Sequence, residues 1–310
     1  MSTADKVDEH MSNLQIPADL QTLLATMMDV KERREDGVLL GNQAWEFFVP
    51  FPKKHPTRKT AYVIGTGPSL KKIDVSKLKD EHTITFNRAY IAFEEWGFDP
   101  TYYLSIDPVD IHSIHKDINN LIENSEIKKF FLSEVVKSNP IYKDEFDIDL
   151  KEKENVHFLI SPPHGMCCFL PFSHFVDAKR KNLIFTPLAP NAGWCGLKML
   201  YQLGYEEVAL LGCDARYKTD EESQKDVMWF DDGCVSTADT DANHFREDYF
   251  GKDQKFGLPN EAQQIAHWRE AALEIGHFGL PIKVYSCSEG SNLNNYFPYI
   301  DFEDFLNGKR

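Results

Sequence analysis

The sequence predicts an α/β fold with a mostly parallel sheet and helices on both faces. Between about residues 60 and 290, short apolar runs of strand length alternate with segments of helical periodicity. The clearest unit has a helical pattern over residues 195–203, a glycine at Gly204 and a buried apolar run at residues 207–211. Strands that alternate with helices in this way pair in parallel through right-handed crossovers.

The elements follow from local composition. Strands are predicted where β-branched and aromatic residues gather, at 61–64, 82–86, 102–106, 128–133, 156–160, 207–211 and 282–286. Helices are predicted over 111–122, 195–203 and 259–276, and residues 70–78 form a helix or a turn. Two stretches lack clean periodicity: 161–181, which we interpret as a loop covering a site, and about 215–256, which we interpret as a mobile lid.

The N-terminal part has a different character from the rest. We expect residues 1–57 to form a helical and extended arm, and residues 58–310 to form a nucleotide-binding domain that carries the lid. The arm has several aromatic residues between positions 45 and 51, which would face water unless they pack on the domain or on a second subunit. A homo-oligomer is therefore one expectation.

Composition excludes some classes of function. A chain of 310 residues with 42% hydrophobic residues buries a sizeable core. Its net charge of −15 repels phosphates and opposes sequence-independent binding of nucleic acid. No run of eighteen apolar residues occurs, and the N-terminus lacks the basic start of a secretory signal, so we expect no transmembrane segment and a cytoplasmic protein. The six cysteines show no CxxC spacing and are expected to be reduced.

The loop after the first predicted strand is a candidate nucleotide cradle. It contains Gly65, Thr66, Gly67 and Ser69, with a proline before the serine. Glycines let backbone N–H groups converge where a phosphate or ribose can approach without meeting a Cβ atom. The loop lacks the third glycine of the dinucleotide fingerprint and the lysine of the phosphate-binding loop. A tight turn without a ligand is therefore the alternative interpretation.

Polar residues follow other predicted strands. Asn87 and Asp107 come directly after apolar runs, and Asp214 closes a third. Ligands gather at the carboxyl ends of parallel strands, so these residues are candidates for contacts to a ribose, a base or a phosphate-bound metal. Asp107 could equally cap a helix that begins at Pro108. Asn191 stands at a helix start, where its side chain would cap the helix and free N–H groups would meet an anion or a carbonyl.

Three sequence blocks resemble bacterial CMP-sialyltransferases of glycosyltransferase family 42. They are residues 65–70, residues 191–193 together with 203–208 and 211–214, and residues 243–245. The wider superfamily that they resemble includes motility-accessory (DUF115-type) proteins and archaeal hydroxymethylpterin diphosphokinases. The resemblance implies a Rossmann-like fold, as a GT-A-like sialyltransferase variant with a lid. It also implies metal-independent transfer of a nonulosonic sugar from a CMP donor to a glycan, lipid-linked or protein acceptor, without a cofactor.

The resemblance also implies roles for single residues. His244 would be the general base, and lid tyrosines Tyr217 and Tyr249 would support the leaving phosphate. The family has Gly-Asn-Gly in the first loop and Thr-Ser-Gly in the second, so Thr66, Asn191 and Ala192 depart from its pattern. The donor would be held by Gly65, Thr66, Gly67, Ser69, Asn87, Asn191, Ala192 and Gly193.

The residue types suit this chemistry. Sugar transfer needs a base for the acceptor hydroxyl and donors for the departing phosphate. An imidazole, with an ordinary pKa near 6.5, serves as a base close to neutral pH, whereas a solvent-facing loop histidine is the alternative for His244. The lid aspartates, Asp241 among them, are interpreted as a solvated acidic loop, or as ligands of a divalent ion if the reaction were phosphoryl transfer.

Two other functions remain open from the sequence. One is an ATP- and Mg²⁺-dependent diphosphokinase of the 6-hydroxymethylpterin type, in which Asp107 and Asp214 would hold the metal. The other is a non-catalytic module that binds a nucleotide or a glycan.

Overall fold

In the computed structural model, the described residues are 48–50, 57–134, 148–160, 175–177, 182–186, 188–189, 191–217, 227–230, 233–237, 240–256, 260–277 and 279–310. The chain divides into two compact units, residues 1–49 and residues 50–310. Strand β1 (Phe48–Pro50) spans this boundary in the sequence. Almost all of the predicted arm lies outside the described residues, so its packing stays a prediction.

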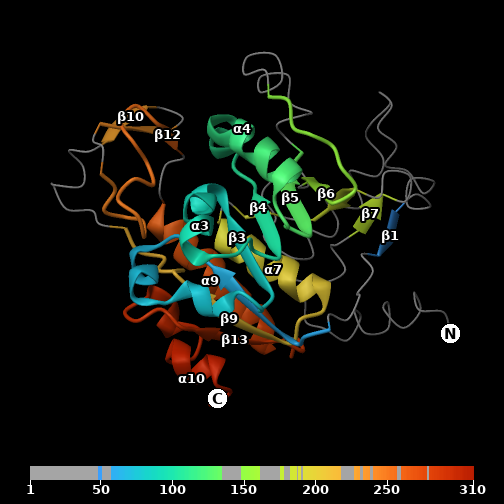
Figure 1. Cartoon of the computed structure of the whole chain (residues 1–310). Coiled ribbons are helices and arrows are strands. Elements are labelled where there is room, and N and C mark those ends of the chain that lie inside the picture. Colours follow the sequence, from blue (N-terminus) through green and yellow to red (C-terminus); the bar gives the residue numbers. More distant parts are fainter. Residues whose placement is uncertain are drawn as a thin grey trace, which may run out of the picture. The chain divides into compact units, whose positions relative to one another are not determined.

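The second unit is built on a mostly parallel sheet (Figure 1). Every adjacent pair from β8 to β13 is parallel, and β7 runs antiparallel to β8. The strands are, in spatial order, β7 (Phe175–Asp177), β8 (Leu183–Phe185), β6 (Val156–Ile160), β5 (Lys129–Ser133), β4 (Tyr102–Ser105), β3 (Thr83–Phe86), β2 (Thr60–Ile64), β9 (Glu207–Leu211) and β13 (Lys283–Ser286). The predicted α/β sheet and its strands from β2 to β6, with β9 and β13, are confirmed.

The order of the strands reverses beside β2. From β2 the chain winds outward through β3 and β4, and it later returns to place β9 on the other side of β2. Ile64 pairs with Thr85 on one side and with Leu211 on the other, so the carboxyl ends of the three strands are level. In open α/β sheets, ligands bind outside the carboxyl ends at such a switch point.

Helices cover both faces of the sheet, as predicted. Along β2, Tyr62 and Ile64 face one core cluster, and Ala61 and Val63 face the other, as the two-residue period of a strand requires. The first cluster includes residues of α3 (Phe93–Trp96), α4 (Pro108–Asn124) and α10 (Phe302–Leu306). The second includes residues of α7 (Ala192–Leu203) and α9 (Glu261–His277).

The region predicted as a lid contains a small sheet of its own. Strands β10 (Val227–Phe230), β11 (Gly233–Ser236) and β12 (Lys255–Phe256) pair antiparallel, and β12 lies against α4. Short 3₁₀ helices complete the fold: η2 (Pro68–Lys72) and η3 (Val75–Leu78) occupy the predicted helix or turn, followed by η4 (Asn87–Ala92) and η6 (Asn292–Asn295).

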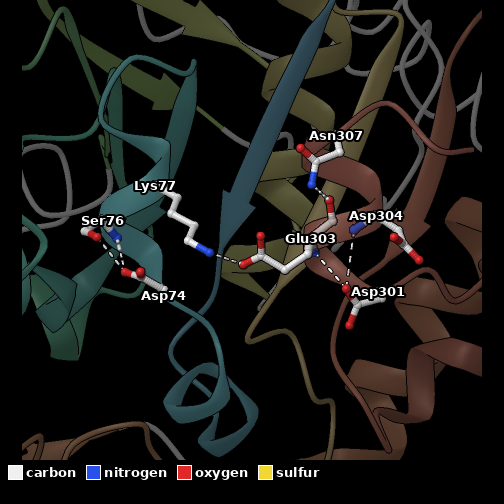
Figure 2. A network of polar contacts seen from close by, with 7 residues as sticks. All are labelled: Asp74, Ser76, Lys77, Asp301, Glu303, Asp304 and Asn307. Carbon is white, nitrogen blue, oxygen red and sulfur yellow. Dashed lines mark hydrogen bonds and ion pairs between the residues drawn. The ribbon is translucent and has the colours of Figure 1, made fainter.

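The C-terminal helix α10 was not predicted and is tied to the amino-terminal half of the domain. Figure 2 shows Lys77 of η3 paired with Glu303 of α10, and Asp301 accepting a hydrogen bond from the backbone N–H of Glu303 at 2.9 Å. Exposed ion pairs of this kind stabilise little. The ring of Phe305 is fully buried and meets Tyr62 of β2 edge-on at 5.6 Å, so apolar burial holds the helix in place.

Among the described residues, no helix has the length and apolar character needed to cross a membrane.

Candidate functional site

Two loops meet at the switch point. The first loop, residues 65–69, follows β2, and the second loop, residues 212–214, follows β9. The backbone N–H of Gly65 donates to Leu211 O at 2.6 Å, and that of Gly67 donates to Gly212 O at 2.8 Å. The N–H of Ser69 donates to Asp214 Oδ2 at 2.9 Å. Three N–H groups of the predicted cradle are therefore already bound within the protein.

The glycines of these loops allow the close approach of the two backbones. A Cβ atom on Gly65 would lie 2.4 Å from Gly212 O, and one on Gly67 would lie 2.5 Å from Asp214 Oδ2. Gly212 has a φ of +60°, a backbone conformation that glycine adopts without strain. Chain packing thus accounts for these glycines, whereas the sequence suggested room for a phosphate. Binding of a phosphate by the first loop stays a prediction.

Asp214 holds the loops together. Its Oδ2 atom accepts from Ser69, and its backbone carbonyl accepts from the N–H of Asn292 in η6 at 3.1 Å. Its Oδ1 atom and the hydroxyl of Ser69 are buried and have no hydrogen-bond partner among the described residues. Buried polar atoms are usually paired, so these two atoms mark a place for water or a ligand group.

The start of α7 lies next to the second loop. Asn191 Oδ1 accepts from the N–H of Trp194 at 3.0 Å, which confirms the predicted cap, and Ala192 is the first residue of the helix. A Cβ atom on Gly193 would lie 3.5 Å from Cys213 Sγ. Asn191 Nδ2 is a buried donor without a partner among the described residues. One donor at this helix start is therefore available to a ligand.

Asn87 stands at the end of β3 in a left-handed conformation with a φ of 51°. Asparagine tolerates this conformation better than most residues. Its Nδ2 atom donates to Asp110 Oδ2 at 2.9 Å, its Oδ1 atom accepts from Ser105 Oγ at 3.1 Å, and its carbonyl accepts from the Tyr103 hydroxyl at 2.6 Å. The side chain is therefore held rigidly against β4 and the first turn of α4.

Two aspartates begin α4. Asp107 Oδ1 accepts from the N–H of Val109 at 2.8 Å, which confirms the capping interpretation of this residue. Asp110 was missed from the sequence, although its spacing of three from Asp107 places both on one helix face. Burial, and then the Asp107 carboxylate, raises the pKa of Asp110 to about 7, against the opposing effect of Arg88. An acid that titrates near neutral pH thus adjoins Asn87.

His244 lies in residues 241–250, which we call the base segment after the role that the sequence predicts for His244. Its Nδ1 atom lies 2.7 Å from Asp241 Oδ2, and its side chain is 17% exposed. The ring stacks on Tyr249 with centroids 3.9 Å apart and planes 5° from parallel. The side chain of Asp241 is 8% exposed, so the interpretation of Asp241 as part of a solvated acidic loop is wrong. The cause is the contact with His244, since a buried polar group needs a hydrogen-bond partner.

The base segment is attached to the first loop at Thr66. The N–H of Phe245 donates to Thr66 O at 2.9 Å, and the ring of Phe245 packs against Trp96 of α3 at 6.1 Å. Burial raises the pKa of Tyr249, and the Thr66 side chain and the backbone of Arg88 oppose that rise. Tyr249 thus interacts with the first loop and supports the ring of His244.

Tyr217 approaches the same place from the side of α9. Its hydroxyl accepts from Gln264 Nε2 at 2.8 Å, and its backbone N–H donates to Glu261 Oε2 at 2.8 Å. Burial raises the pKa of Tyr217, with further contributions from the charges of Asp110 and Asp241. Both its hydroxyl and its backbone thus bind residues of α9.

The arrangement brings most of the predicted site residues to one edge of the sheet. His244 stacks on Tyr249 in the segment that is bonded to Thr66, and the start of α7 lies beside the second loop. Asn87 is held against α4, and Tyr217 is held against α9. Gly65, Gly67, Ser69 and Asp214 bind each other and form the floor at the switch point. In the part of the chain that the structure describes, no three His, Cys, Asp or Glu side chains are grouped as a metal ion would require.

The sequence matches no family model and no curated protein. Among solved structures, the chain is similar to the sialyltransferase CstII from Campylobacter jejuni in complex with the substrate analogue CMP-3FNeuAc. The two share 19% identity over 78% of this chain and 86% of that chain, with a TM-score of 0.41. The CstII complex with cytidine-5'-monophosphate is similar at 19% identity, over 79% of this chain and 86% of that chain, with the same TM-score of 0.41.

A second similar protein is the MAf glycosyltransferase from Magnetospirillum magneticum AMB-1. It shares 14% identity over 77% of this chain, with a TM-score of 0.41. This chain spans 33% of the length of that protein. Identities this low give no residue-by-residue correspondence, so the chemistry below rests on this chain's own geometry.

Proposed function

We propose that this protein is a glycosyltransferase that moves a nonulosonic sugar from a CMP-activated donor to an acceptor hydroxyl, with His244 as the general base and without a metal ion. The class of reaction comes from the resemblance of the three sequence blocks to family 42. The observation that carries the proposal is the setting of His244: its Nδ1 atom is bound to Asp241 at 2.7 Å, and its ring is stacked on Tyr249. No described residue hydrogen bonds its Nε2 atom, which is left for substrate.

The reaction uses this setting as follows. The acceptor oxygen forms a bond to the anomeric carbon while the bond from that carbon to the CMP phosphate oxygen breaks. The electron pair of the broken bond leaves with the phosphate, and the acceptor proton passes to Nε2 of His244. Asn191 Nδ2, a buried donor without a partner among the described residues, and the Tyr217 hydroxyl are the groups that stabilise the departing phosphate.

The acceptor is a glycan, a lipid-linked saccharide or a protein hydroxyl. The whole chain carries a net charge of −15, which repels an anionic ligand. An anionic donor therefore depends on local donors such as Asn191 for its binding. We therefore propose that the CMP phosphate binds near the start of α7 and that the sugar binds near Asn87 and His244.

Replacing the base tests the proposal most directly. We expect His244→Ala to lower the rate of CMP release from CMP-sialic acid by about 100-fold or more, because a positioned general base contributes that much. The affinity of His244→Ala for CMP should equal that of wild type. Addition of EDTA should leave the rate of the wild-type protein unchanged. His277→Ala, at an exposed histidine at the end of α9, is the matched control. Turnover by His244→Ala at the wild-type rate would show that another group is the base.

A nucleotide screen separates the alternatives. Because a bound nucleotide raises the melting temperature by mass action, CMP, CDP, UDP, GDP and ATP are compared with and without Mg²⁺. Stabilisation by CMP alone supports the glycosyltransferase. Stabilisation by ATP only with Mg²⁺ supports the diphosphokinase, and binding of nucleotide without any turnover supports a binding module.

A further inference from the structure

We infer that Asp241 is the positioning residue for His244, holding the ring proton on Nδ1 so that Nε2 remains the basic nitrogen. The effect of Asp241 on catalysis rests on the proposed function. The position of the proton on the ring follows from the geometry alone. An ionised carboxylate only accepts hydrogen bonds, so a distance of 2.7 Å between Asp241 Oδ2 and His244 Nδ1 requires the proton on Nδ1.

Asp241 is itself fixed in orientation. Its Oδ1 atom accepts from the backbone N–H of Asn243 at 2.8 Å, and its own N–H donates to Glu247 O at 2.8 Å. One carboxylate oxygen is thus bound to backbone, and the other faces the imidazole. The two oxygens cannot exchange these roles without breaking both hydrogen bonds.

The plane of the imidazole is fixed from the other side. The His244 ring lies flat on Tyr249 at 3.9 Å, and the edge-on contact with Phe250 has centroids 5.2 Å apart. Tyr249 is 3% exposed, and the N–H of Phe245 in the same segment donates to Thr66 O at 2.9 Å. The base is therefore connected to the first loop, so the loop that forms the floor of the site also sets the position of His244.

The carboxylate has a second effect during the reaction. When Nε2 takes the acceptor proton, the ring becomes an imidazolium, and the adjacent negative charge of Asp241 stabilises it. The guanidinium of Arg88 lies over the ring of Phe250 at 5.4 Å, and Arg246 is paired with Asp248 and Glu95. Of these charges, Asp241 alone makes direct contact with the His244 ring.

The change Asp241→Asn tests the inference, and its outcome follows from the two oxygens. The amide oxygen keeps the bond from Asn243, so the amide NH₂ group faces His244 Nδ1 and donates to it. The ring proton then moves to Nε2, and the base is blocked. The matched control is Glu247→Gln, which removes one charge at an exposed position of the same segment.

The first readout is independent of activity. In protein labelled with ¹⁵N-histidine, the signal of His244 is identified among the 11 histidines by its loss in His244→Ala. We expect the neutral ring to carry its proton on Nδ1 in wild type and in Glu247→Gln, and on Nε2 in Asp241→Asn. A wild-type ring protonated on Nε2 would overturn the inference, and this measurement needs no folded variant of Asp241.

The second readout is kinetic. We expect Asp241→Asn to lower kcat for CMP-sialic acid by about 100-fold with KM nearly unchanged, because the loss falls on proton transfer and not on binding. A normal kcat despite a displaced proton would also overturn the inference. If the proton shifts as expected but wild type turns over no CMP-sugar, the pair is established and the proposed function fails.

Discussion

The first loop and the base segment meet at Thr66, yet different interactions hold them in place. In the first loop, Gly65 and Gly67 bind the second loop through backbone hydrogen bonds, and a Cβ atom at either position would collide with it. The base segment is held in place by buried aromatic rings and by the hydrogen bond between Asp241 and His244. The glycines thus build the floor of the site, while side chains from distant segments supply the groups that are open to a ligand.

The largest expected effect comes from filling the space between the two loops. Gly65→Ala places a Cβ atom 2.4 Å from Gly212 O, where two main chains must move apart. We expect a loss of about 3 kcal/mol or more in the free energy of unfolding. Urea denaturation followed by circular dichroism measures it.

Gly276→Ala is the matched control for this change. It makes the same substitution in α9, where no atom of the described residues, apart from the helix backbone and the chain neighbours, lies within 4 Å of the added Cβ. Because alanine is the better helix former, this variant should be more stable by up to about 1 kcal/mol. A Gly65→Ala protein as stable as wild type but unable to bind CMP would show that the first loop is a ligand cradle.

The second prediction concerns the link between the two regions. Tyr249→Phe removes a buried hydroxyl that interacts with the Thr66 side chain and the backbone of Arg88. We expect the free energy of unfolding to fall by about 1–2 kcal/mol. Tyr285→Phe, at a tyrosine that packs through its ring on Phe305 at 5.5 Å, is the control. Equal stability of the two variants would mean that the two regions are not coupled through Tyr249.

Local patterns were enough to predict the scaffold of this site. The apolar runs of β2 and β9 stop at glycines, and α7 ends at Gly204, which has the left-handed conformation of a helix C-cap. Missed elements such as α3, β7, β8 and α10 have only three to five residues, and a segment so short carries little periodicity of its own. Their formation depends on packing against the sheet.

The roles of two site residues were not predicted for a related reason. Asp110 and Asp241 are ordinary acidic residues in the sequence, and each acquires its role from a partner that the fold supplies, Asn87 for one and His244 for the other. Similarly, the sequence cannot distinguish a glycine that makes room for a ligand from one that makes room for another backbone. Gly65 meets Gly212 only because β2 and β9 are neighbours in the sheet.

The third prediction tests whether the helix start binds the donor. Asn191→Ser keeps a good helix cap and deletes the buried, unpaired Nδ2 atom, so stability should stay within about 0.5 kcal/mol of wild type. Affinity for CMP should fall about tenfold, since a hydrogen bond to a charged phosphate is lost. Isothermal titration calorimetry measures the change. Unaltered affinity would place the phosphate away from α7.

The smallest expected effect is electrostatic. Because burial raises the pKa of Asp110 to about 7, this carboxyl is mostly neutral at pH 6 and charged at pH 8. Its negative charge beside Asn87 repels a bound phosphate, so affinity for CMP should fall as the pH rises through 7, by about threefold. The phosphate of CMP also titrates in this range, but it does so equally for every variant. Asp110→Asn removes only the contribution of the Asp110 charge to the pH dependence. The affinity of this variant for CMP should exceed that of wild type at pH 8 and equal it at pH 6. Parallel pH profiles for the two proteins would place the ligand beyond the reach of α4 and confine it to the side of the base segment.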